Sequence, residues 1–294
     1  HALWSGSEVA LQELGKVHGF SSLEEEKAKY ENGNTRRDSL KHYSGAMFYY
    51  GGEWYWGIDR LYHLEQRLAD LGADRLPDTS VIMPKQEVKA GRLRDNGSLT
   101  LEVFASVRSP YTAMIFDRAL ELAKTTGVTL QVRPILPMVM RGVSATREKG
   151  IYIFSDAARE ARASNVPFGQ FYDPIGEPSR RCFSLYPWAF TQGKGNELLS
   201  SFLSAAFAEG VNTNKEDGLG YVVEKAGLEW ASAKQVVGQN GWQDTLEENR
   251  LAMYESGLWG APSFRLLDRN NKVVLALWGQ DRLWLIAKEI DRLL

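Results

Sequence analysis

Cysteine and histidine are scarce in this chain of 294 residues, and their scarcity excludes several kinds of site. Cys182 is the single cysteine, so these residues cannot form an intrachain disulfide, a two-cysteine redox motif or a thiolate zinc site. All four histidines lie at or before His63, which leaves no Ser-His-Asp or Cys-His arrangement in the long region after it. We therefore expect no bound metal, and chemistry in that region would rest on hydroxyls, carboxylates, backbone dipoles or a cofactor.

Charge of one sign is not in excess either, and long apolar runs are missing. The 35 Lys and Arg residues nearly balance the 37 Asp and Glu residues, which gives a net charge of −2 and predicts no nucleic-acid partner. No run of about 18 uncharged apolar residues occurs, so no membrane-spanning helix is expected. The first residues lack the basic and apolar segments of a secretory signal. Together with the lone cysteine, these features predict a cytoplasmic location.

The residues that are present indicate a globular chain of the α/β class. Hydrophobic residues make up 44% of the sequence, enough for a sizeable core, and the length favours two domains or one large one. A strand, a helix and a second strand follow one another closely, which is typical of a βαβ unit with parallel strands. The expected elements after residue 98 are a strand over 99–107, a helix from Ser109-Pro110 to Thr126, a strand over 128–135, helices over 151–164, 195–209, 217–226, 231–239 and 243–256, a hairpin over 263–277 and a helix over 281–294.

The beginning of the chain repeats a pattern found at its end. The sequence Gly45-Ala46-Met47-Phe48 followed by Trp56-Gly57-Ile58-Asp59-Arg60-Leu61 parallels Gly260-Ala261-Pro262-Ser263-Phe264 followed by Trp278-Gly279-Gln280-Asp281-Arg282-Leu283. The early copy is expected to have helices over 3–19, 22–43 and 58–71 around a hairpin at Gly51-Gly52. Both copies are therefore expected to form a hairpin followed by a helix.

This repeat predicts the domain organisation. Residues 1–75 are interpreted as the back half of a degenerate domain, 76–98 as a linker, and 99–294 as a complete domain with a helical insertion over about 151–256. The missing strands of the first domain would lie outside these residues, or the other domain would cover its edge. Such a tandem could form a pseudo-dimer within one chain, and a dimer of chains is the other possibility.

Three positions are candidates for chemistry. Ser109 stands where a strand meets a helix, and the free N–H groups of a helix N-terminus stabilise an anion; otherwise Ser109 is a plain helix cap. Pro262 precedes a strand, and a cis bond there would free the backbone to pair with a bound peptide; otherwise it is an edge-strand proline. Asp281, after Gln280, begins the last helix and could bind an ammonium group, or could act only as a cap.

In order and spacing, these features resemble a known family. The stretch VFASVRSPYTAMIFDRALELA, the segment from Tyr152 to Arg159 leading to Val166-Pro167-Phe168, the Pro178-Ser179-Arg180-Arg181 turn, and GAPSF followed by WGQDRL are similar to the DsbA-like branch of the thioredoxin superfamily. The nearest resemblance is to 2-hydroxychromene-2-carboxylate isomerases and kappa-class glutathione transferases. It implies an α/β thioredoxin-like fold with an inserted helical domain, preceded here by a partial repeat of the same fold.

The resemblance also implies a function. The chain would be a glutathione-dependent isomerase or transferase that acts on a small conjugated or aromatic electrophile, with glutathione as cofactor. Ser109 would hydrogen-bond the glutathione thiolate, and the backbone of Ala261, before a cis Pro262, would pair with the cysteinyl part. Asp281 would hold the γ-glutamyl ammonium. Tyr111 and Gln280 complete the expected contacts.

Departures from the family pattern keep two alternatives open. The loop over 141–147 lacks the asparagine that often contacts glutathione, and Met47 replaces the proline in the early copy. The chain could therefore be a catalytically silent binding or scaffold protein. The other alternative is a thiol–disulfide oxidoreductase, but Ser109 and Thr112 stand where those enzymes have the two cysteines of C-P-x-C.

Cys182 follows two arginines that could lower the pKa of its thiol. A buried, inert thiol is the favoured interpretation.

Overall fold

A computed structural model describes residues 2, 5–77, 79 and 81–294 of the chain. Its strands are β1 (Met47–Tyr50), β2 (Glu53–Trp56), β3 (Thr100–Ala105), β4 (Thr129–Pro134), β5 (Ser263–Leu267) and β6 (Val273–Trp278). Its helices are α1 (Glu8–His18), α2 (Leu23–Ser39), α3 (Leu61–Asp70), α4 (Pro110–Thr126), α5 (Arg147–Ala163), α6 (Glu177–Thr191), α7 (Gly195–Phe207), α8 (Glu216–Lys225), α9 (Trp230–Ala233), α10 (Trp242–Glu255) and α11 (Leu283–Leu293). Three short 3-10 turns are η1 (Ile58–Arg60), η2 (Met138–Arg141) and η3 (Gln280–Arg282).

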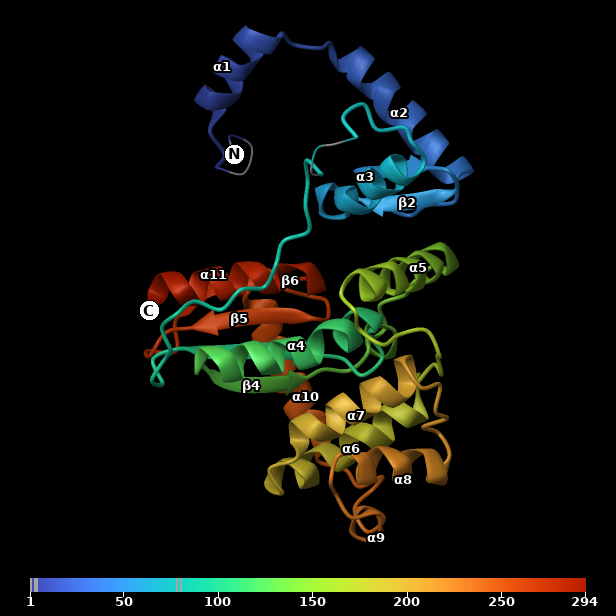
Figure 1. Cartoon of the computed structure of the whole chain (residues 1–294), viewed down its shortest axis with the longest axis vertical. Helices are drawn as coiled ribbons and strands as arrows, with labels where there is room; N and C mark the ends of the chain where they lie inside the picture. The colour runs from blue at the N-terminus through green and yellow to red at the C-terminus, as the bar shows by residue number, and fades with distance from the viewer. Residues whose placement is uncertain (1, 3–4, 78, 80) are drawn as a thin grey trace.

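A four-stranded sheet in the order β4-β3-β5-β6 forms the centre of the molecule. Strand β3 pairs in parallel with β4 and antiparallel with β5, and β6 closes the sheet antiparallel to β5. Helices α4 and α11 cover one face, where Ile115 and Ile286 pack against Val103 (Figure 1). On the other face Phe104 packs against Met253 of α10. This arrangement confirms the predicted thioredoxin-like α/β fold with a helical insertion between β4 and β5.

The insertion contains one helix that the sequence interpretation missed. The segment Pro178-Ser179-Arg180-Arg181, interpreted as a turn, is instead the first turn of α6, which runs on to Thr191 and has Pro187 in its interior. Pro178 is tolerated because the N–H of a first-turn residue has no helical partner. The helix exists because it buries Cys182, Phe183 and Leu185 in the core that it forms with α7. Tertiary burial thus outweighs the cost of an interior proline.

Residues 5–77 form a smaller unit beside α5. The hairpin β1-β2 turns at Gly51-Gly52, both with positive φ, as predicted. Among the described residues this hairpin pairs with no further strand. Helix α1 begins at Glu8 rather than near the chain start, and positions 3 and 4 of the expected helix lie outside the described residues.

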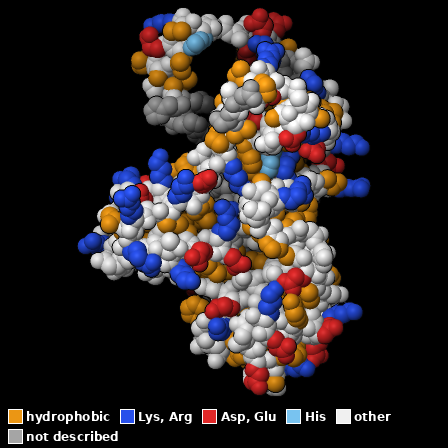
Figure 2. All heavy atoms as spheres, viewed as in Figure 1, with side chains coloured by type: hydrophobic (Ala, Val, Ile, Leu, Met, Phe, Trp, Pro, Cys, Tyr) orange, Lys and Arg blue, Asp and Glu red, His pale blue; other side chains and the backbone are white. Residues whose placement is uncertain are grey.

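Helices α1 and α2 extend away from the rest of the molecule (Figure 1). They bury no side chain, and Val9 and Val17 of α1 are exposed. Figure 2 shows hydrophobic side chains on the surface of this part of the molecule. The linker that follows α3 has no helix or strand in its described residues and runs alongside α11 before β3. Among the described residues, no helix has the length and apolarity that crossing a bilayer requires.

Candidate functional site

Ser109 lies at the junction of β3 and α4, as predicted. Its Oγ accepts a hydrogen bond from the Thr112 N–H at 3.1 Å and donates one to the Ala261 carbonyl at 3.0 Å. The first contact caps the helix, because Ser109 has the extended backbone of an N-cap residue and Pro110 follows it at the first helical position. The second ties the helix end to the loop before β5. Ser109 and Ala261, which are 152 residues apart, are thus brought together.

The Ala261–Pro262 peptide bond is cis. This is the geometry in which the preceding backbone is expected to be free to pair with a bound peptide. The loop around it is fixed by two contacts: Ser263 Oγ donates to the Gly260 carbonyl at 2.6 Å, and the Gly279 N–H donates to the Pro262 carbonyl at 3.0 Å. Pro262 is buried and Ala261 is half-buried. The loop therefore presents a defined backbone edge next to Ser109.

A cavity of about 540 Å³ opens beside Ser109. We call it the Ser109 cavity. Its wall is mainly apolar and aromatic, with Tyr111, Trp259 and Trp278 close to the cis-proline loop and the α5 side chains Ile153 and Phe154 opposite. A volume of this size is typical of small-molecule sites.

Two cations at this cavity have no carboxylate partner among the described residues. Lys149 Nζ lies 5.6 Å from the ring centre of Trp259 and 5.9 Å from that of Tyr43. Arg141 donates to the Leu136 carbonyl at 3.0 Å and to the Tyr254 hydroxyl at 2.8 Å, both uncharged acceptors. Arg108, also in the wall, is neutralised by a two-bond contact with Asp173 at 2.7 Å. The Ser109 cavity therefore combines aromatic surface with uncompensated positive charge.

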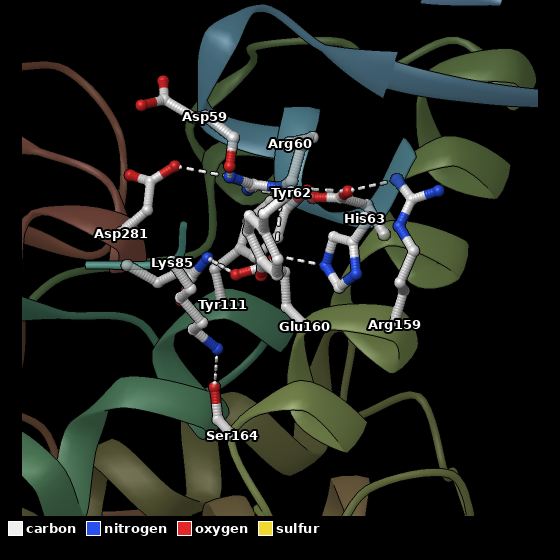
Figure 3. Close-up of polar contacts among 12 residues, drawn as sticks. Asp59, Arg60, Tyr62, His63, Lys85, Tyr111, Arg159, Glu160, Ser164 and Asp281 are labelled. Carbon is white, nitrogen blue, oxygen red and sulfur yellow. Dashed lines mark hydrogen bonds and ion pairs between the residues drawn. The ribbon is translucent and has the colours of Figure 1, made fainter. Parts of the chain in front are cut away.

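Asp281 lies at the start of η3, as predicted, but it already has a cationic partner. Arg60 of the early unit places Nη1 2.7 Å from Asp281 Oδ2, and the same guanidinium bonds both oxygens of Asp156 at 3.0 Å (Figure 3). Arg60 is 3% exposed, and Asp156 is completely buried. The other oxygen of Asp281 has only a 3.4 Å contact with Arg282. One carboxylate oxygen therefore remains weakly bonded.

Tyr111 and Gln280 are also part of this polar cluster. The Tyr111 hydroxyl donates to Asp156 at 2.8 Å, and Gln280 Nε2 donates to Glu160 at 2.8 Å. Burial raises the pKa of the Tyr111 phenol well above its ordinary value, with the Asp156 charge acting in the same direction. Tyr111 therefore stays protonated and serves as a donor.

Glu160 is the second buried carboxylate of the cluster. It accepts hydrogen bonds from Tyr62 and, at 2.7 Å, from His63 Nε2, and it lies 3.5 Å from Arg60 Nε. Burial alone would raise its pKa, but these bonds and the charge of Arg60 together lower the pKa of Glu160 well below its ordinary value. Burial lowers the pKa of His63, so that ring is neutral at pH 7 and donates through Nε2.

The contacts between the two repeat copies are reciprocal. Arg60 of the first copy bonds Asp281 of the second, while Arg282 bonds Asp59 with two contacts of 2.8 and 2.7 Å. The equivalent rings Trp56 and Trp278 also face each other, with centroids 5.8 Å apart. Each copy of the W-G-x-D-R-L motif thus supplies an arginine to the aspartate of the other copy.

A smaller hollow of about 140 Å³ joins these parts of the site. It runs from the cis-proline loop to Asp281, and Trp56, Tyr111, Ala261 and Trp278 belong to both its wall and that of the Ser109 cavity. All six predicted site residues thus lie in one region. Sequence reasoning missed Arg60 and Glu160, although the position of Arg60 in the repeat, matching Arg282, was a usable signal.

Cys182 lies in the buried face of α6 and does not belong to this site. The predicted burial is confirmed, and it raises the pKa of the thiol far above the ordinary value, as expected for an inert cysteine. We expect the folded protein to react with iodoacetamide at pH 8 at least about 100-fold more slowly than the urea-unfolded chain. Mass spectrometry would measure the labelling, and equal rates in the two states would contradict the burial of this cysteine.

Comparisons with known proteins agree with the geometry. The family model named DSBA-like thioredoxin domain matches residues 100–291 of this chain. Among solved structures, a 2-hydroxychromene-2-carboxylate isomerase is 21% identical with a TM-score of 0.54, over 66% of this chain and 95% of that one. The probable DsbA oxidoreductase from Streptomyces coelicolor is 17% identical with a TM-score of 0.50, over 65% and 89%.

Cytosolic disulfide reductase DsbM from Pseudomonas aeruginosa is 18% identical with a TM-score of 0.48, over 66% of this chain and 100% of that one. No curated protein matches the sequence. At these identities the isomerase and the Streptomyces coelicolor protein show a common fold with this chain.

Proposed function

Because this chain belongs to the DSBA-like thioredoxin domain family, we propose that it is the glutathione-dependent isomerase or transferase that its residues indicate, acting on a small conjugated or aromatic electrophile. The observation that carries the proposal is the Ser109 hydroxyl, held at the N-terminus of α4 against the cis-proline loop and open to a cavity of about 540 Å³. A disulfide oxidoreductase is not proposed, since the chain contains one cysteine and that thiol is buried.

The residues around Ser109 fit a thiol cofactor. Glutathione, when bound, would supply a thiolate that adds to the substrate and leaves again. The positive end of α4 and the Ser109 hydroxyl would stabilise the negative sulfur, if the hydroxyl turns its hydrogen away from the Ala261 carbonyl. The Ala261 backbone would hold the cysteinyl part. The small hollow leads to the weakly bonded oxygen of Asp281, which would accept the γ-glutamyl ammonium.

The wall of the Ser109 cavity favours an aromatic or conjugated substrate that carries a negative group. Trp259, Trp278 and Tyr111 offer flat apolar surface, and offset stacking on such rings is favourable. Lys149 and Arg141 lack carboxylate partners among the described residues, so an anionic group of the substrate would supply one. A neutral aliphatic electrophile would use neither feature.

We also propose that the early unit is a second copy of the domain, reduced to its back half, and that it acts as a partner within the chain. The reciprocal pairs Arg60–Asp281 and Arg282–Asp59 support this pseudo-dimer. The early unit would complete the ligand site, because Trp56 lines both the Ser109 cavity and the small hollow and Arg60 forms an ion pair with Asp281. A cytoplasmic location, where reduced glutathione is abundant, fits this function.

One observation favours a second candidate, a binding protein without catalysis. The Ser109 hydroxyl donates its hydrogen to the Ala261 carbonyl, so it has no hydrogen left to donate to a ligand. If that bond persists when a ligand is present, Ser109 is only a helix cap and the Ser109 cavity only a binding pocket.

Titration with reduced glutathione separates these proposals. Calorimetry measures binding, and ultraviolet absorbance measures formation of the thiolate. The enzyme should release heat and ionise the thiol near pH 7, whereas the control S-methylglutathione should release heat without any thiolate signal. Heat from both compounds with no thiolate would favour the silent binding protein. Absence of heat with reduced glutathione would overturn the proposed function.

A further inference from the structure

A second cavity, of about 430 Å³, lies where α3, the linker, α4 and α11 meet. We call it the linker cavity; it is lined by Ile58, Tyr62, Lys85, Arg118, Trp284 and Lys288, among others. It shares no lining residue with the Ser109 cavity and meets the small hollow only at Asp59, Gln280 and Asp281. It is therefore distinct from the Ser109 cavity, and Gln280 and Asp281 stand where it borders the small hollow.

Each of the three carboxylates of the linker cavity has partners of its own. Glu160 accepts bonds from His63, Tyr62 and Gln280 and lies beside Arg60. Asp281 is paired with Arg60, and Asp59 is paired with Arg282. The Glu160 hydrogen bonds come from uncharged donors, so its charge still acts on Lys85 and Arg118, although it bonds neither.

The cations of the linker cavity are not neutralised in the same way. Among the described residues, neither Arg118 nor Lys288 has a carboxylate within 4.0 Å, and Lys85 donates only to the Ser164 hydroxyl at 2.5 Å while its Nζ lies 5.7 Å from the ring centre of Tyr62. Burial lowers the pKa of both Lys85 and Arg118. The charge of Glu160 acts in the opposite direction on both, and the charge of Arg118 lowers the pKa of Lys85. Two half-buried cations thus line one cavity, and among the described residues neither is bonded to a carboxylate.

The linker places Lys85 in the wall of this cavity, with its ammonium group directed to Ser164 (Figure 3). The Glu65 carboxylate of α3 accepts hydrogen bonds from the backbone N–H groups of Ile82 and Met83, at 3.0 and 2.8 Å. These bonds fix the two residues that precede Pro84 and Lys85. The linker is therefore a positioned wall of the cavity and supplies one of its charges.

We propose that the linker cavity binds the oxyanion of a small organic molecule, a carboxylate or a phosphate. Arg118 and Lys85 would bond the oxyanion, with Lys288 at the edge. A planar guanidinium matches the oxygens of either group in pairs, and an ammonium adds a point charge. Trp284 and Ile58 would contact the apolar body of the ligand, and the cavity volume is in the range of small-molecule sites. This inference does not depend on the proposed function at Ser109.

Calorimetric titration of the whole chain with inorganic phosphate, phenyl phosphate and benzoate tests the inference. At least one of the two organic anions should bind saturably and more tightly than inorganic phosphate, because only the organic anions use the apolar wall. The comparison of phenyl phosphate with benzoate identifies which oxyanion the site prefers. Absence of saturable binding by all three probes, or equal binding of phosphate and both organic anions, would overturn the proposal.

Variants locate the binding. Arg118→Gln and Lys85→Gln should each raise the Kd of the preferred anion at least about 10-fold, because each variant removes one charge-assisted hydrogen bond. Arg118→Lys, which keeps the charge, should retain most of the affinity. Lys124→Gln on the exposed side of the same helix is the matched control and should bind like wild type. Arg118→Gln should not lower the melting temperature, because it removes an uncompensated charge. Unchanged anion binding in both glutamine variants would contradict the assignment.

Discussion

Replacement of Arg60 by Ala is expected to lower the free energy of unfolding by about 3–5 kcal/mol. The guanidinium is 3% exposed and lies among Asp156, Glu160 and Asp281, of which Asp156 and Glu160 are buried. Removal of the cation leaves Glu160 with uncharged hydrogen-bond donors and leaves Asp156 with Arg159 as its remaining cationic partner among the described residues. Water cannot reach the two buried carboxylates to compensate. Urea unfolding at pH 7, followed by circular dichroism, would measure the loss.

Arg282→Ala is the matched control, because Arg282 occupies the equivalent position in the other repeat copy. Its side chain is 30% exposed and its partner Asp59 is 33% exposed, so water replaces much of the lost interaction. We expect this variant to lose about 1 kcal/mol or less. A similar loss in both variants would show that burial of the Arg60 cluster does not determine its contribution.

The Arg60→Ala deficit should also depend on pH. In the wild-type protein the pKa of Glu160 lies well below its unfolded value, so its contribution to stability is complete above about pH 4.3 and is lost as the pH falls further. Without Arg60 the buried Glu160 carboxylate should have a higher pKa, and it would take up a proton in the folded state. The difference in unfolding free energy between variant and wild type should therefore shrink between pH 7 and pH 4. A constant difference would contradict this electrostatic account.

The part of the fold that the sequence predicts best is the part whose local signals agree with its packing. Strand β3 has the β-branched and apolar residues of a buried strand, Ser109-Pro110 begins α4, and Gly127 ends it with φ +79°. Helix α6 could not be predicted in the same way. Its two prolines and the nearby glycines are local signals for a turn, and only the burial of residues such as Phe183 against α7 explains the helix.

The candidate site shows the same division. Ser109 follows β3, Pro262 directly precedes β5 and Asp281 follows β6, and the order and direction of these strands bring all three to one end of the sheet. The partners of Asp281 could not be inferred, because the Arg60 contact joins residues 221 positions apart and depends on how two units dock. The repeated W-G-x-D-R-L motif indicated that the copies are related, but not that each arginine bonds the aspartate of the other copy.

Replacement of Ser109 by Ala should reduce the rate of glutathione-dependent turnover by about 10²–10³-fold, the usual cost of removing one donor from a developing negative charge. The α4 N-terminus would remain, so some thiolate stabilisation would persist. Stability should fall by only about 1 kcal/mol, which is the cost of losing a helix cap. Thiolate absorbance of bound glutathione at pH 7, together with urea unfolding, would separate the two effects.

Thr112→Val is the control for this variant, because Thr112 stands where disulfide oxidoreductases have their second cysteine but is completely buried. Its hydroxyl has no hydrogen-bond partner among the described residues, so its loss should leave the thiolate signal unchanged. Glutathione that binds Ser109→Ala with an undiminished thiolate signal would mean that the helix terminus alone ionises the thiol. In that case the Ser109 hydroxyl keeps its bond to the Ala261 carbonyl throughout, and its role is to hold α4 against the cis-proline loop.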